Sequence, residues 1–97
     1  MGNTAALQKA RYYARRDFVN RIKDNPCADC GVRYPPYVMQ FDNIGTESHI
    51  NVARLVSRAV SEERILREIE KCELVCANCH AERTFSRAGY IAEWPNR

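Results

Sequence analysis

Two C-x-x-C pairs constrain the fold of this chain more than any other feature. Cys27 and Cys30 form CADC, Cys76 and Cys79 form CANC, and a long segment separates the pairs. Two residues between thiolates let both sulfurs bind one ion from a tight turn, and Gly31 after the first pair is typical of such a turn. Two such turns predict a closed, four-thiolate site for structural zinc. A chain of 97 residues buries little surface, so this cross-link would supply much of its folding free energy.

Disulfides and redox chemistry are the alternatives for these cysteines. The total of five cysteines is odd and the N-terminus lacks a secretory signal, which disfavours disulfides. No βαβ pattern surrounds either pair, which disfavours a thioredoxin-like role. Cys72 stands at the end of the helical pattern SEERILREIEKC, where we expect it to be buried as an apolar residue rather than to bind metal.

The charge of the chain is uneven. Its net charge is +3, and residues 1–25 carry six basic and two acidic side chains. A basic end on a small domain predicts a polyanionic partner, although a charged helix face is often simply solvated. No apolar run reaches the roughly 18 residues of a membrane span. We therefore expect a soluble, cytoplasmic protein without a membrane partner.

The N-terminal segment is typical of a helix over residues 4–24, ended by Asn25-Pro26. Its expected buried face consists of Leu7, Ala10, Ala14, Phe18 and Ile22. The opposite face carries the basic residues Lys9, Arg16 and Lys23, spaced seven apart. These three side chains are candidate DNA contacts or part of a solvated surface.

The remaining pattern predicts an α+β fold. We expect strands at 38–41 and 73–76, and helices at 51–59, 61–72 and 77–89. Ser61 is the expected N-cap of the second of these helices, which should bury Ile65, Leu66 and Ile69. We divide the chain into a basic helix (1–25), a central domain (26–87) and a C-terminal tail (88–97). The tail holds Tyr90, Ile91 and Trp94, which could dock onto the domain or onto a partner.

Several polar residues lie between and beside the cysteine pairs. Asp42 ends the first predicted strand, and His80 follows the last cysteine at the start of a helix. A zinc ion that holds both segments would let this carboxylate and imidazole flank one divalent ion, with coordination positions left for water and phosphate oxygens. The alternatives are a turn-forming role for Asp42 and a surface position for His80.

The motifs FDN-x7-N and KCELVCANCHAERT resemble the HNH endonucleases, specifically their small zinc-containing phage and bacterial type. The resemblance covers Pro26 to Arg87. It implies a ββα-metal fold, in which two strands and a helix surround a catalytic Mg²⁺ or Mn²⁺ held by Asp42 and His80. Asn51 would brace the loop between the strands, and the four paired cysteines would hold structural zinc. The implied activity is hydrolysis of double-stranded DNA, in a bacterial or phage-infected cell.

Asn43 departs from this pattern. The family has histidine directly after the aspartate, where it takes a proton from the attacking water. A carboxamide can orient water but is not basic near neutral pH, and loss of a general base typically costs about 10²–10⁴-fold in rate. We therefore expect impaired cleavage with retained DNA and metal binding. Asn43 is an introduced substitution, or it marks a naturally inactive DNA-binding relative, or His49 serves as another base. His49 is otherwise a loop residue or a phosphate contact.

Two arginines complete the candidate DNA contacts. Arg83 lies one helical turn after His80 and can reach the phosphate near the metal, and Arg87 follows one turn later. The full candidate set is Lys9, Arg16, Lys23, His49, Arg83 and Arg87. The rival interpretation is a non-catalytic, zinc-stabilised nucleic-acid-binding module; a redox or protein-interaction zinc domain is a third. The sequence leaves open nicking or double-strand cleavage, and with it a homodimer.

Overall fold

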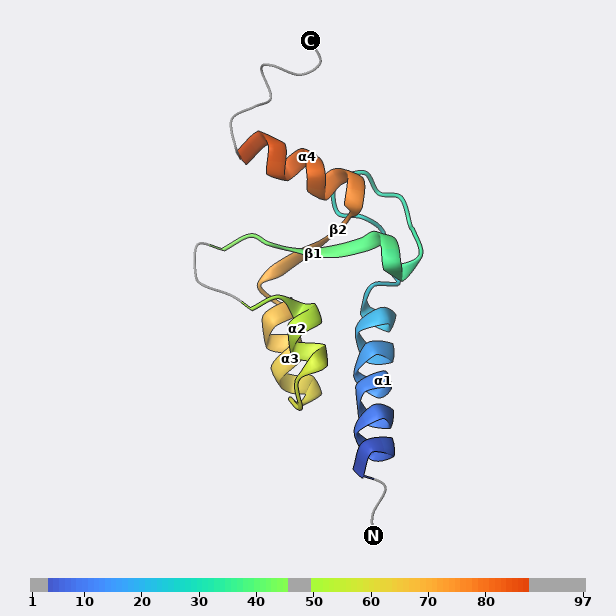
Figure 1. Cartoon of the computed structure of the whole chain (residues 1–97). Helices are drawn as coiled ribbons and strands as arrows, with labels where there is room; N and C mark the ends of the chain where they lie inside the picture. The colour runs from blue at the N-terminus through green and yellow to red at the C-terminus, as the bar shows by residue number, and fades with distance from the viewer. Residues whose placement is uncertain (1–3, 46–49, 88–97) are drawn as a thin grey trace.

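The computed structural model describes residues 4–45 and 50–87 and has an α+β architecture (Figure 1). Two antiparallel strands cross the middle of the molecule. Helix α4 lies on one side of them, and α1, α2 and α3 lie on the other. The elements in chain order are α1 (Thr4–Ile22), the 3₁₀ turn η1 (Pro36–Val38), β1 (Met39–Asn43), α2 (Val52–Ser57), α3 (Glu62–Ile69), β2 (Cys72–Cys76) and α4 (Ala77–Arg87). Within this described part, no helix combines the length and the apolar character needed to cross a membrane.

The strand register places chemically important residues opposite one another. Asp42 pairs with Glu73, and Asn43 pairs with Cys72. The expected position of Cys72 at a helix end was wrong, because α3 stops at Ile69 and Cys72 begins β2. Cys72 is half-buried, and its thiol donates a hydrogen bond to the backbone carbonyl of Glu68 at 3.4 Å. The two expected strands are confirmed, each with slightly different ends.

The expected buried face of α1 is confirmed only in its C-terminal part, where Phe18 and Ile22 are half-buried against the helical core. Leu7 is 50% exposed, Ala10 and Ala14 are also exposed, and Val19 is the buried residue within α1. The physical reason is geometric: the N-terminal part of α1 extends beyond the ends of α2 and α3, and residues 4–11 are exposed (Figure 1). From Tyr12 onward the helix reaches the helical core, where Arg15 Nε also donates a hydrogen bond to the carbonyl of Val56 at 2.8 Å.

Two small cores hold the described residues together. The first joins the three helices on one side of the sheet through Val19, Val52, Leu55, Val56, Ile65 and Ile69. The second surrounds the cysteine pairs through Cys27, Met39, Val75 and Cys76. Because the second core is so small, its cohesion depends on what links the cysteines.

Helix α3 begins as expected and packs in an unexpected way. The Ser61 hydroxyl accepts a hydrogen bond from the backbone N–H of Arg64 at 3.1 Å, which confirms the N-cap. Leu66, however, is 40% exposed, whereas Glu68 is 1% exposed. The apolar pattern could not reveal this, because a buried carboxylate is stable only with partners that the fold brings to it.

Glu68 has three such partners. Its carboxylate accepts the backbone N–H of Ile50 at 3.3 Å and forms ion pairs with Arg64 at 3.3 Å and Lys71 at 3.5 Å. Burial raises the pKa of Glu68, but these partners outweigh burial and hold the pKa below its ordinary value. The carboxylate thereby anchors Ile50, which precedes α2, to α3.

Substituting Glu68→Gln should lower the free energy of unfolding by about 1–3 kcal/mol near neutral pH, because buried charge-assisted hydrogen bonds are lost. Since the pKa of Glu68 is lower in the folded state, its contribution is complete above the unfolded pKa. That contribution is lost as the pH falls through the folded pKa. Urea denaturation of both proteins at neutral and acidic pH should therefore show a difference that shrinks in acid. Glu70→Gln, at an exposed position two residues after Glu68, is the control. A stability difference between Glu68→Gln and the parent that stays constant with pH would contradict this role of Glu68.

Candidate metal centres

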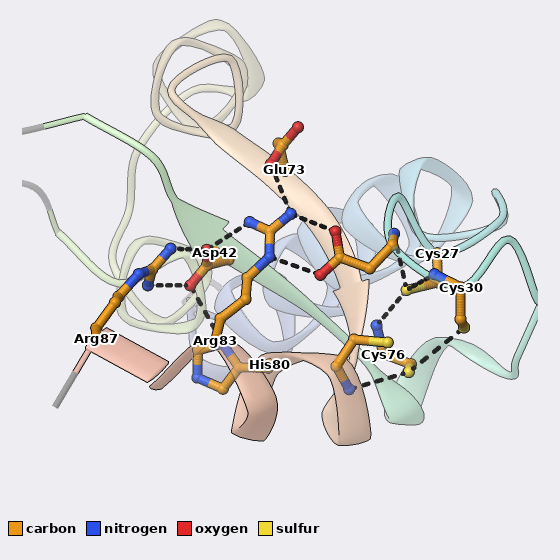
Figure 2. Close-up of polar contacts among 10 residues, drawn as sticks. Cys27, Cys30, Asp42, Glu73, Cys76, His80, Arg83 and Arg87 are labelled. Carbon is orange, nitrogen blue, oxygen red and sulfur yellow. Dashed lines mark hydrogen bonds and ion pairs between the residues drawn. The ribbon is translucent and has the colours of Figure 1, made fainter. Parts of the chain in front are cut away.

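The four paired cysteines converge on one point. Their Sγ atoms all lie within 4.8 Å of one another, and the Cys30 and Cys76 sulfurs are 4.0 Å apart. Cys27 and Cys30 come from the loop after α1, Cys76 ends β2, and Cys79 lies in the first turn of α4 (Figure 2). Small inward movements would bring four sulfurs at this spacing to the usual Zn–S distance of about 2.3 Å. The cluster can thus hold a structural metal such as zinc, as the spacing predicted.

Hydrogen bonds and burial in this cluster favour a bound cation. The Cys27 sulfur accepts backbone N–H groups from Asp29, Cys30 and Cys76 at 3.3–3.5 Å. Burial raises the pKa of Cys27, but these N–H donors lower it to about 6. Contact with the Cys76 sulfur, and then burial, raise the pKa of Cys79 far above its ordinary value. Contact with a neighbouring sulfur thus opposes ionisation of Cys79, and a divalent cation would allow several thiolates to share this space.

A second pair of candidate ligands lies next to the cysteines. Asp42, near the end of β1, is 3% exposed, and His80 lies in the first turn of α4. The Nδ1 atom of His80 is 3.3 Å from Oδ1 of Asp42. This nitrogen is buried and has no hydrogen-bond partner among the described residues. The structure therefore brings together the carboxylate and imidazole singled out in the sequence.

Two arginines of α4 bind the Asp42 carboxylate (Figure 2). Arg87 donates to both carboxylate oxygens at 3.0 and 2.7 Å, and Arg83 donates to Oδ2 at 2.7 Å. The Arg87 guanidinium lowers the pKa of Asp42 to about 2 against the opposing effect of burial, and Arg83 adds to the shift. Both arginines were predicted to contact phosphate; here they neutralise the carboxylate of the candidate site.

Arg83 also joins three separate segments. Its side chain is 19% exposed and binds Asp29 through two hydrogen bonds and Glu73 through one, all at 2.7 Å. Glu73 is directly opposite Asp42 in the strand register, where two like charges would repel. A guanidinium shared between them removes this repulsion. Sequence reasoning missed Asp29 and Glu73, because their proximity follows from the strand register and from the first cysteine turn.

A groove connects this pair to the N-terminal helix. It is a cavity of about 890 Å³ between α1, β1 and α2, and its lining includes Asp42, Asn43, His80, Arg16 and Lys23. The Asn43 carboxamide oxygen accepts the backbone N–H of Gly45 at 2.9 Å, so its side chain is part of the turn after β1. Asn43 thus lies in the same cavity as the two candidate ligands.

The other predicted residues have separate positions. Asn51 lines the groove, but its carboxamide oxygen caps α2 by accepting the N–H of Ala53 at 2.7 Å. Lys9 is exposed on α1 and does not line the groove. His49, the residues of the tail and the predicted end of α4 at Gly89 lie outside the described residues.

Comparison with known proteins adds no assignment: no family model, no curated protein and no solved structure matches the chain.

Proposed function

We propose that this chain is an HNH-type DNA endonuclease whose activity is impaired by Asn43. The observation that carries the proposal is the buried Nδ1 of His80, which has no hydrogen-bond partner among the described residues and lies 3.3 Å from the Asp42 carboxylate beside the cysteine cluster. A buried imidazole nitrogen this close to a carboxylate oxygen is a suitable ligand pair for a small divalent ion. Two protein ligands leave room for water and for phosphate oxygens.

In this proposal, Asp42 and His80 hold Mg²⁺ or Mn²⁺, which would stabilise the negative charge that develops on the phosphate. Arg87 is 53% exposed and so can leave Asp42 and contact a DNA phosphate. Arg83 is far less exposed and stays with its carboxylates. Asn43 can orient a water molecule in the groove but cannot accept its proton. Binding of duplex DNA and of the metal is retained while cleavage is slow.

The rival function is a zinc-stabilised nucleic-acid-binding module without catalysis. A specific contact favours it: Arg83 and Arg87 already satisfy both oxygens of Asp42. In that case the carboxylate is a structural ion-pair partner, and no second metal binds.

Calorimetric titration of the zinc-loaded protein with Mn²⁺ distinguishes the two functions. We expect one Mn²⁺ site. Its affinity should fall by more than about 10-fold in Asp42→Ala and in His80→Ala, because loss of a residue that only hydrogen-bonds to a metal ligand already costs about 10–100-fold in affinity. Asp17→Ala removes an exposed carboxylate from α1 and should leave Mn²⁺ binding unchanged. If the folded, zinc-loaded parent binds no Mn²⁺, the endonuclease proposal is wrong and the non-catalytic nucleic-acid-binding module is favoured.

A further inference from the structure

The groove between α1, β1 and α2 has the chemistry of a binding site in its own right. Its volume, about 890 Å³, is within the range of about 300–1,000 Å³ that is usual for ligand sites. Figure 1 shows α1 running beside α2 and α3 below the strands. One part of the groove includes Asp42 and His80, and it extends over β1 to Tyr37 and the basic face of α1.

The charges of the groove favour an anionic ligand. Arg16 comes from α1, Lys23 directly follows α1 and Arg87 comes from α4, while Asp42 is the single carboxylate among the described lining residues. Arg87 already neutralises Asp42. Arg16 and Lys23 form no ion pair with any carboxylate in the described part of the chain. Both cations are therefore available to phosphate groups.

Aromatic rings accompany these cations. The Arg16 guanidinium lies 5.8 Å from the Tyr12 ring centroid, and the Lys23 ammonium lies 5.7 Å from that of Phe41. Tyr37 is 86% exposed and is the middle residue of the turn η1. An aromatic ring left this exposed, in the lining of the same groove as the two cations, offers a stacking surface. Alternating aromatic and cationic side chains in a groove are typical of proteins that bind unpaired bases.

The shape of the groove selects a single strand over a duplex. Stacking on Tyr37 or Phe41 requires a base whose face is free, and the bases of a duplex are stacked on one another. The groove is also too small for a double helix but has room for a few nucleotides. Its amides, among them Gln40 and Asn20, can bond to base edges.

From these features we infer that the groove binds an unpaired DNA strand of a few nucleotides and leads its backbone to Asp42 and His80. This inference rests on the proposed function only for cleavage of the phosphodiester that reaches Asp42 and His80. Binding of the strand in the groove does not require cleavage. The substrate would then be DNA with a locally unpaired strand, such as a flap, a bubble or an opened duplex.

Fluorescence anisotropy tests the inference with a labelled oligo-dT and with a blunt duplex of the same length. The protein is zinc-loaded and no Mg²⁺ or Mn²⁺ is added, so that no strand is cut. We expect the single strand to bind more tightly than the duplex. Tyr37→Ala should weaken single-strand binding by about 5- to 100-fold, the usual effect of losing one stacking ring, whereas Tyr37→Phe should retain it.

The salt dependence tests the cations separately. Lys23→Gln should reduce the slope of log K against log salt by about 0.7, the value for one phosphate contact on a single strand. Arg67→Gln, on the exposed face of α3 and away from the groove, should leave the slope unchanged. Equal thermal melting of the variants shows that each has folded.

Two outcomes would overturn the inference: duplex binding as tight as single-strand binding, or unchanged affinity in Tyr37→Ala. Failure of the proposed function has a different signature. In that case the protein binds the single strand selectively and this binding depends on Tyr37, yet the Asn43→His variant does not cut the strand. If instead such a variant cuts duplex DNA without any preference for unpaired strands, the function stands and the groove assignment is wrong.

Discussion

Substituting Asn43→His should raise the rate of DNA cleavage by about 10²–10⁴-fold in the presence of Mg²⁺ or Mn²⁺. The imidazole would lie in the same groove as Asp42 and His80, at the end of β1. Its pKa is close to neutral, so it can take a proton from an attacking water, which the carboxamide cannot do. Conversion of supercoiled plasmid to nicked and linear forms measures the gain.

Controls separate restored catalysis from altered binding. Asn43→Gln keeps the carboxamide and should show no gain. The double variant Asn43→His with Asp42→Ala should be inactive, because a candidate metal ligand is missing. If Asn43→His folds, binds zinc and is supplied with metal but cleaves no faster than the parent, position 43 is not that of the general base.

Removal of zinc should unfold the protein, which is the second large effect we expect. Structural zinc contributes about 10–16 kcal/mol of apparent binding free energy in small domains, as much as the whole stability of a typical domain. The core around the cysteines contains little else to hold it together. A strong chelator, or Cys76→Ser, should abolish the cooperative thermal transition seen by circular dichroism.

Cys72→Ser is the matched control for this prediction. Cys72 is half-buried in β2 and belongs to none of the described clusters that could hold a metal. Its substitution should leave zinc content unchanged and cost little stability. A chelated protein that keeps the melting transition of the untreated one would show that the cysteine cluster does not hold the fold together.

Sequence reasoning predicted the cysteine cluster because the chemistry is local. Two residues between thiolates set the geometry of each turn, and the ion requires both turns to meet. The proximity of Asp42 and His80 was predicted for the same reason. Each residue lies close in sequence to a segment that the cysteine cluster would hold in place. The cap at Ser61 was equally local: a hydroxyl before a run of glutamates and apolar residues.

Long-range packing was beyond the sequence. The apolar spacing of α1 predicted a buried stripe that included Leu7. Which of these residues are buried depends on how far α1 extends beyond α2 and α3, and the spacing does not contain this information. Periodicity likewise predicted that Leu66 is buried, whereas the structure buries Glu68 instead. Two partners that make this burial possible, Ile50 and Lys71, lie outside α3. No periodic pattern carries that information.

The contacts of Arg83 have a consequence for the two candidate ion sites. Asp29 lies between the cysteines of the first pair, and Asp42 belongs to the candidate catalytic pair; one guanidinium binds both. Any shift of the first cysteine turn therefore reaches the carboxylate that would hold the second ion. Such coupling is reciprocal by thermodynamic linkage, so occupancy of either site changes the affinity of the other by the same factor. In the proposed function, loss of zinc would therefore also weaken binding of the second ion at Asp42 and His80, and with it DNA cleavage.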